Sequence, residues 1–126
     1  MEILGTGIDV VENARIAASI ERFGEKFLGR VFLAGEQAYC RAMRDPAPHY
    51  AARFAAKEAV SKAFGCGIGG ELAFTDIEVT RAETGEPGIR LHGNGRRLAE
   101  RRGVTRVFLS LTHTREYAAA HVLLVR

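Results

Sequence analysis

The chain has 126 residues, of which 47% are hydrophobic and 26% are charged. This length suits one domain that buries roughly two-thirds of the surface its unfolded form exposes, and the composition excludes disordered, collagen-like and coiled-coil classes. The formal net charge is +3, with a sequence pI of about 9.2. The two cysteines, Cys40 and Cys66, have no metal-site spacing and are too few for a disulfide framework, so a reducing compartment fits best.

The N-terminus, MEILGTGIDVV, lacks a basic segment followed by an apolar one, as a secretory signal would have. No stretch approaches the roughly 20 apolar residues that span a bilayer. We therefore expect a cytoplasmic protein that does not contact a membrane.

The first predicted element is a strand from Ile3 to Val11. Gly5 and Gly7 lie inside it, which indicates that another element approaches its backbone closely. Asn13 can cap a helix that continues to about Arg22, and a second helix is expected from Gly35 to Arg44.

The strongest helix signal covers Tyr50 to Phe64, fifteen residues of which six are alanine. The two prolines of Asp45 to Pro48 predict a turn or loop before it, and Gly65 is a stop signal after it.

The remaining residues alternate between strand and turn signals around one short helix. We expect a strand from Leu72 to Arg81, a turn at residues 83–88, a strand from Ile89 to His92, a helix from Asn94 to Arg102 closed by Gly103, and strands from Arg106 to Leu111 and from Ala118 to Val125. No regular βαβ repeat appears. The sequence therefore predicts an α+β fold, a single domain over residues 1–126 with a largely antiparallel sheet and a long alanine-rich helix.

Residues 65–70, GCGIGG, satisfy the spacing GxGxxG but follow a helix, whereas a dinucleotide-binding fingerprint follows a strand and opens a helix. We reject that reading. The glycines either let backbone N–H groups approach a phosphate or form a helix cap and turn, and the sequence leaves both open. The arginines between Arg96 and Arg106 crowd one segment, which either attracts phosphates or an acidic partner or is a solvated helix face.

Two carboxylates lie in apolar surroundings. Asp9 is in the first strand and Glu58 is in the alanine-rich helix, and a carboxylate placed there is costly unless it is paired or holds a cation. Mg²⁺ is typically bound by one or two carboxylates together with substrate phosphates, so the two could form such a pair. The simpler alternatives are a strand-end cap for Asp9 and an ion pair with Lys62, four residues on, for Glu58.

Two further polar residues are candidates for ligand contact. Lys57 points about 100° away from Glu58, toward another face of the same ligand or toward solvent. His113 lies just past a strand, where a loop can present it to a ligand, although a lone histidine is more often structural.

Four segments carry a resemblance to a known family: GIDVVE at residues 7–12, RFAAKEAVSK at 53–62 with the following AFGCGIG, FTDIEV at 74–79, and SLTHTREYA at 110–118. In order and spacing across nearly the whole chain, they resemble the small bacterial branch of the 4'-phosphopantetheinyl transferases, the holo-[acyl-carrier-protein] synthases.

The resemblance implies the 4'-phosphopantetheinyl transferase fold and a Mg²⁺-dependent reaction. The 4'-phosphopantetheine group of coenzyme A would pass to a serine of apo acyl carrier protein, in support of fatty acid biosynthesis, with release of adenosine 3',5'-bisphosphate. It also implies a homotrimer with active sites at subunit interfaces, which composition does not show.

The family's site residues carry over to matching positions. Asp9 and Glu58 would hold Mg²⁺, Lys62 would hold a coenzyme A phosphate, and the coenzyme A site would also include Arg53, Ser61, Gly65, His113 and Thr114. The surface that docks the acidic carrier would include Arg15, Arg22, Lys26, Phe27 and Arg30. The alternative is an ordinary surface charge for each basic residue and a place in the core for Phe27. Glu58, a metal-bound water and His113 are all candidates for the group that deprotonates the carrier serine, and the sequence does not rank them.

Three other functions share some of these features. A transferase serving a polyketide or peptide synthase carrier would share every catalytic residue. A basic nucleic-acid-binding module should interleave aromatic residues with lysine or arginine, and residues 96–106 contain no aromatic residue, so we expect no nucleic-acid partner. A non-catalytic trimeric scaffold would gain nothing from Asp9, Glu58 and Lys62.

Overall fold

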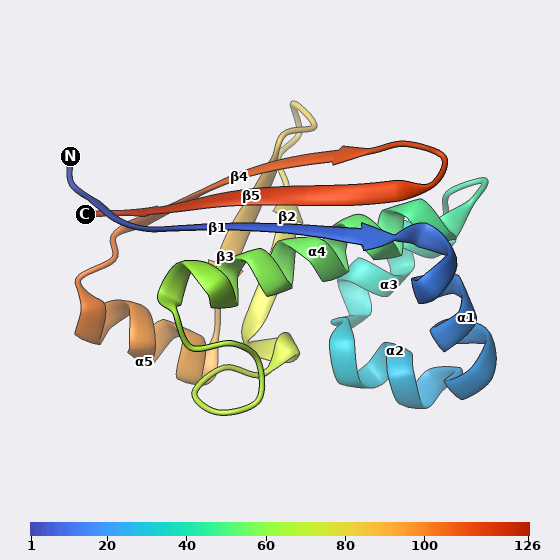
Figure 1. Cartoon of the computed structure of the whole chain (residues 1–126), viewed down its shortest axis with the longest axis horizontal. Coiled ribbons are helices and arrows are strands. Elements are labelled where there is room, and N and C mark those ends of the chain that lie inside the picture. Colours follow the sequence, from blue (N-terminus) through green and yellow to red (C-terminus); the bar gives the residue numbers. More distant parts are fainter.

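The computed structural model describes all 126 residues. Its centre is one long helix, α4 (Pro46–Phe64), lying along one face of a three-stranded antiparallel sheet (Figure 1). The sheet has the order β1-β5-β4, so that β1 and β4 are its two edges. The strands are β1 (Ile3–Glu12), β4 (Arg106–His113) and β5 (Tyr117–Val125).

Two glycines of β1 set the distance between the sheet and α4. A Cβ atom on Gly7 would overlap the carbonyl oxygen of Ala59, and one on Gly5 would overlap that of Ala63. The strand therefore lies directly against the helix backbone, where not even a methyl group fits on these two residues of the strand. This close approach confirms the prediction made from Gly5 and Gly7.

The other elements surround α4 at its ends and on its far side. Three short helices lie at one end, α5 lies at the other, and a hairpin crosses behind α4 (Figure 1). Their bounds are α1 (Asn13–Phe23), α2 (Glu25–Val31), α3 (Ala34–Arg41), the 3₁₀ turn η1 (Phe74–Asp76), β2 (Ile77–Arg81), β3 (Pro87–Leu91) and α5 (Gly93–Arg102).

The predicted α+β class is confirmed, and three differences from the predicted elements exceed a shift of a few residues. The loop expected at Asp45 to Pro48 is wrong, because α4 begins at Pro46 and both prolines occupy its first turn, where no intrahelical N–H bond is lost. The strand expected from Leu72 begins only at Ile77. The helix α2 was not predicted, since Gly24 and Gly29 interrupt its pattern.

The sheet face that points away from α4 exposes apolar side chains. Residues alternate across β1, so that Gly5 and Gly7 face α4 while the side chains of Ile8 and Val10 face outward, with exposed fractions of 62% and 60%. Phe108 and Tyr117 are also exposed. None of the helices is long and apolar enough to span a membrane.

Candidate active site

Asp9 and Lys62 meet where β1 crosses α4. Asp9 lies two residues after Gly7 on the same side of β1, and Lys62 donates to its Oδ1 at 2.9 Å and to the carbonyl oxygen of Ile8 at 3.1 Å. The Asp9 side chain is 15% exposed and that of Lys62 is 52% exposed. The expected alternative, an ion pair between Lys62 and Glu58, is not formed.

Glu58 lies one turn before Lys62 on α4 and forms no ion pair. Burial, and after it the negative charge of Asp9, raise the pKa of Glu58 above its usual range, while Lys62 and Arg15 oppose the shift. Two carboxylates are therefore close enough to repel each other, and both side chains are partly exposed to solvent.

This pair fits a hard divalent cation. No group of three or more histidine, cysteine, aspartate or glutamate side chains gathers anywhere in the chain. Asp9 and Glu58 alone would therefore leave several positions on Mg²⁺ for water and substrate phosphates, which is the usual way this ion is bound. A bound cation would also offset the burial and the Asp9 charge that together raise the pKa of Glu58.

Ser61 and Gly65 continue along the same helix. Ser61 is buried, and its hydroxyl donates to the carbonyl oxygen of Glu58 at 2.7 Å, so in this structure its hydrogen bond lies within α4. Gly65 ends α4 with φ of 76°, and an added Cβ would meet no atom within 4 Å. The glycine-rich segment after it is therefore an open helix cap and turn beside Lys62.

Both expectations for Lys57, contact with a ligand and exposure to solvent, are wrong. It is fully buried, and its ammonium group forms an ion pair of 2.7 Å with Glu36 of α3. The sequence around Lys57 gave no sign of this ion pair, because Glu36 is 21 residues away in the chain.

Arg53 belongs to a second group of polar side chains. It is 3% exposed and lies over the ring of Tyr39, with its guanidinium carbon 4.2 Å from the ring centroid. Arg81 of β2 lies 4.8 Å from the same centroid. Tyr39 thus holds two cations near each other, an arrangement suited to an anion.

His113 joins this second group. Its ring centroid is 5.2 Å from that of His49 of α4. Burial and the neighbouring His113, Arg53 and Arg81 lower the pKa of His49 below 6.5. Thr114 lies in the turn after β4, where its hydroxyl accepts N–H bonds from Glu116 and Tyr117.

The predicted site residues therefore form two groups on opposite sides of α4. Along a helix, Arg53 is displaced by about 140° from Glu58 and about 180° from Lys62. Asp9 and His113 lie on the two opposite edge strands of the sheet. One chain brings Asp9, Glu58 and Lys62 together, but it does not bring Arg53 and His113 to them.

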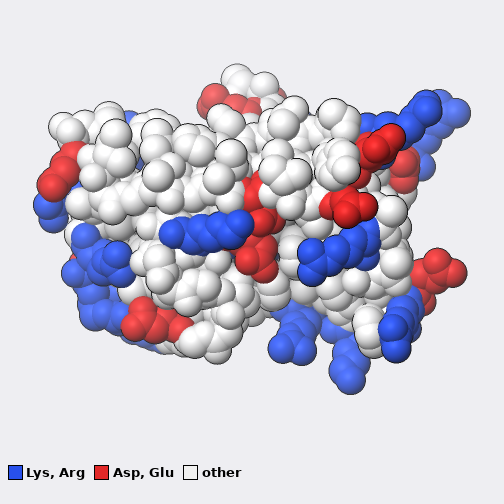
Figure 2. All heavy atoms as spheres, viewed as in Figure 1, with Lys and Arg blue, Asp and Glu red and all other residues white.

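The predicted carrier-docking residues lie on α1 and α2. Figure 2 shows blue side chains beneath this end of the molecule, with a second basic area over α5. Arg15 lies close enough to Glu58 to affect its pKa. Phe27 is half-buried and packs edge-on against Phe32, whereas Phe23, which the sequence analysis did not select, is 50% exposed.

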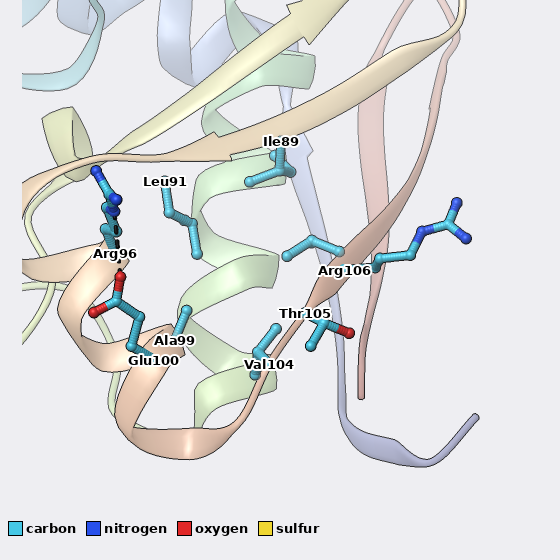
Figure 3. A pocket seen from close by; sticks show the side chains of 9 residues that line it. Ile89, Leu91, Arg96, Ala99, Glu100, Val104, Thr105 and Arg106 are labelled. Atoms are coloured by element: carbon cyan, nitrogen blue, oxygen red, sulfur yellow. Dashed lines mark hydrogen bonds and ion pairs between the residues drawn. The ribbon is translucent and has the colours of Figure 1, made fainter.

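A hollow of about 390 Å³ lies between α5, β3 and the start of β4 (Figure 3). Its lining includes Ile89, Leu91 and Val104, with Arg96 and Arg106 at the rim. None of the predicted site residues lines it. Arg96 is engaged by Glu100 at 3.3 Å, so part of the arginine cluster is neutralised locally.

The model of the 4'-phosphopantetheinyl transferase superfamily matches residues 5–122. The chain belongs to this superfamily. It is 48% identical to the holo-[acyl-carrier-protein] synthase of Koribacter versatilis over 122 residues, covering 97% of this chain and 98% of that protein. It is 47% identical to the synthase of Solibacter usitatus, with the same coverage.

Solved structures of the superfamily share the fold. The holo-[acyl-carrier-protein] synthase of Neisseria meningitidis aligns with a TM-score of 0.91 and 32% identity, over 98% of this chain and 99% of that chain. The synthase of Helicobacter pylori, crystallised in complex with coenzyme A, aligns with a TM-score of 0.86 and 33% identity, over 95% and 99%. The four motifs thus identified the family correctly.

Proposed function

We propose that this chain transfers the 4'-phosphopantetheine group from coenzyme A to a serine of apo acyl carrier protein, in the cytoplasm and with Mg²⁺, in support of fatty acid biosynthesis. The observation that carries the proposal is the group formed by Asp9, Glu58 and Lys62. It combines two adjacent carboxylates with a half-exposed ammonium group, in a member of a superfamily whose relatives are named for this activity.

The chemistry asks the protein mainly for alignment and for neutralisation of charge on the pyrophosphate oxygens. Asp9 and Glu58 would hold Mg²⁺, which supplies Lewis-acid stabilisation when bound. Lys62 is held against the Asp9 carboxylate and the Ile8 carbonyl group, so its half-exposed side chain stays beside the two carboxylates. From there it can exchange one of these acceptors for a phosphate oxygen of coenzyme A.

The second group of polar side chains, around Arg53 and Tyr39, suits a phosphate of coenzyme A other than the one that Lys62 contacts. Arg53 is buried against Tyr39, and Arg81 and His113 lie around it, so that a phosphate there would meet several donors. This group lies across α4 from Lys62. A coenzyme A molecule that contacts both groups would therefore bridge two copies of the chain.

A homotrimer with active sites between subunits would meet this need. The exposed apolar face formed by Ile8, Val10 and Phe108 supports the assembly, since monomers rarely leave such a patch uncovered. In a ring, the group with Asp9 on one copy can face the group with His113 on the next.

Intact mass spectrometry tests the transfer. Purified apo acyl carrier protein is incubated with this protein, coenzyme A and Mg²⁺, and beside it with a chelator added. A phosphopantetheine-sized gain that the chelator prevents is the expected result. No gain with carriers from fatty acid, polyketide and peptide synthesis would contradict the proposal, and a gain with only the latter two would reassign its pathway.

A mixing experiment tests the shared site. Glu58→Gln and Arg53→Gln are each expected to be nearly inactive. After joint refolding, about a quarter of interfaces in random trimers would pair two unaltered groups, so activity should return to roughly that fraction. Activity that stays at the level of the two separate variants would contradict a site shared between subunits.

A further inference from the structure

Lys57, next to Glu58 in the sequence, is buried on a different face of α4. Lys57 is 0% exposed, and its ammonium group donates to Glu36 Oε1 at 2.7 Å, to the carbonyl oxygen of Val31 at 2.7 Å and to that of Phe74 at 3.2 Å. An ammonium group has three donors, so every one is used. Lys57 therefore has no donor left for a ligand.

Glu36 is equally engaged. Its Oε1 atom also accepts the backbone N–H of Leu33 at 2.8 Å, and its Oε2 atom accepts that of Val79 at 2.7 Å. The residue is 3% exposed. The hydrogen-bonding groups of the buried pair are thus all used, by four backbone groups and by the bond between the two side chains.

These backbone groups belong to segments far apart in the sequence. Val31 ends α2, Leu33 precedes α3, Phe74 begins η1 and Val79 lies in β2. The Val31 and Phe74 carbonyl groups are tied to Lys57 of α4 directly, and the Leu33 and Val79 amides are tied to it through Glu36 of α3. The segment that bears the basic residues of α2 is thereby fixed to the helix turn that presents Glu58.

The attraction between the two charges alone does not account for such a pair. Moving two charges out of water costs several kcal/mol per ion, and well-packed apolar residues of similar volume often replace a buried ion pair without loss of stability. Apolar side chains, however, could not hold the Val31 and Phe74 carbonyl groups or the Leu33 and Val79 amides. What the ion pair provides is a fixed arrangement of backbone.

We propose that Lys57 and Glu36 are a positioning pair, which fixes the carrier-docking helix α2 and the β2 segment relative to Glu58 so that the carrier serine meets the bound coenzyme A. This inference rests on the proposed transfer. Neither residue touches substrate or metal. Misplacement of reacting groups by about 1 Å can cost about 100-fold in rate, so a small shift of α2 is enough to matter.

The test uses Lys57→Met combined with Glu36→Leu, which removes both charges together. The matched control is Arg96→Met combined with Glu100→Leu, which removes an exposed ion pair on α5. Folding is followed by circular dichroism, and kinetics are measured well below the melting temperature. We expect kcat to fall at least about tenfold in the first variant, with KM for coenzyme A and Mg²⁺ affinity within about twofold of the unaltered protein.

A structural role alone would lower the melting temperature and leave kcat per folded molecule unchanged. A folded double variant with kcat within about twofold of the unaltered protein would therefore overturn the proposal. If that variant does not fold, Glu36→Gln alone serves instead. It keeps the side-chain size but replaces one acceptor oxygen by an NH₂ group, which cannot accept from the N–H groups that Glu36 binds. The same tenfold loss is expected from it, and the same retention would overturn the proposal.

Hydrogen exchange keeps the inference separate from the transfer itself. In the Lys57→Met, Glu36→Leu variant, residues 25–33 and 74–79 should lose protection while β1 and β5 keep theirs. If the unaltered protein modifies no carrier, the proposed function fails, and this readout still decides whether the pair positions α2. Unchanged protection of both segments would overturn the positioning role.

Discussion

Lys62 pairs with Asp9 across two elements and leaves Glu58, one turn away on its own helix, without a partner of opposite charge. A helix i,i+4 ion pair would have been available and is worth only about 0.3 to 0.5 kcal/mol. The arrangement instead keeps one carboxylate neutralised and one free beside it. Such an asymmetric pair is suited to receive a divalent cation.

Removing either carboxylate should abolish transfer without unfolding the protein. We expect Glu58→Ala to lower kcat/KM by at least about 100-fold, since a charge-stabilising group at a reaction centre is worth that much. Mg²⁺ affinity, measured by calorimetry, should fall with it. His113→Ala should retain slow turnover. Equal loss in both variants, or normal turnover in Glu58→Ala, would contradict these roles.

The pH dependence follows from the raised pKa of Glu58. Between about 4.5, its ordinary value, and the raised value, the folded protein binds more protons at Glu58 than the unfolded chain does. The free energy of unfolding in the presence of chelator should therefore fall as pH rises through this window. With Mg²⁺ the sign reverses, because the metal binds the deprotonated form and stabilises the protein more as pH rises.

Melting temperatures from pH 4.5 to 7, with chelator and with Mg²⁺, measure this difference. Glu58→Gln removes the titrating group, so the pH dependence of its melting temperature gives the contribution of all other residues. Subtracting it from that of the unaltered protein leaves the contribution of Glu58. If the unaltered protein and this variant respond to pH and Mg²⁺ alike, Glu58 is not the group responsible.

Much of the fold could be predicted from local signals. Alanine content and Gly65 defined most of α4, and Gly5 and Gly7 predicted the close contact with β1, because each signal depends on neighbours in sequence or on backbone sterics. The start of α4 at Pro46 was not predicted, since proline restricts the residue before it but is itself favoured in the first turn of a helix.

The site could be predicted only in part, because its contacts are long-range. Motif positions selected Asp9, Glu58 and Lys62, which the fold brings together. Nothing local reveals that Lys57 has a buried partner at Glu36, or that Arg53 faces away from Glu58 toward Tyr39 and Arg81. A lysine in a run of buried alanines was the one available signal, since a buried charge requires a partner.

The contact between β1 and α4 predicts a large cost for a single added methyl group. Gly7→Ala would drive its Cβ into the Ala59 carbonyl oxygen, so the strand must move away from the helix. We expect the free energy of unfolding to fall by about 3 kcal/mol, and transfer to weaken as Asp9 separates from Glu58.

Gly29→Ala is the matched control. Gly29 lies within α2, and a Cβ there meets nothing within 4 Å. Since alanine is favoured over glycine in a helix by about 1 kcal/mol, this variant should be slightly more stable. Urea denaturation of both proteins measures the difference, and equal midpoints would mean that β1 tolerates the displacement.

Carrier docking predicts opposite behaviour for two phenylalanines. Phe23 is half-exposed with Arg22 stacked on its ring, whereas Phe27 packs against the core residue Phe32. Phe23→Ala should raise KM for the carrier with little change in melting temperature, while Phe27→Ala should lower the melting temperature by several degrees. If Phe23→Ala leaves KM unchanged, α1 does not supply the apolar contact.

The charges around these residues should act through encounter with the acidic carrier. We expect Arg22→Glu and Lys26→Glu each to raise KM for the carrier about tenfold at low salt, with a smaller effect at high salt, since rim charges act mainly through screened attraction. Arg97→Glu on α5 makes the same change in net charge at the other end of the molecule and serves as the control. An equal rise of KM in all three would show that total charge governs the encounter; a rise confined to Arg22 and Lys26 places the carrier on α1 and α2.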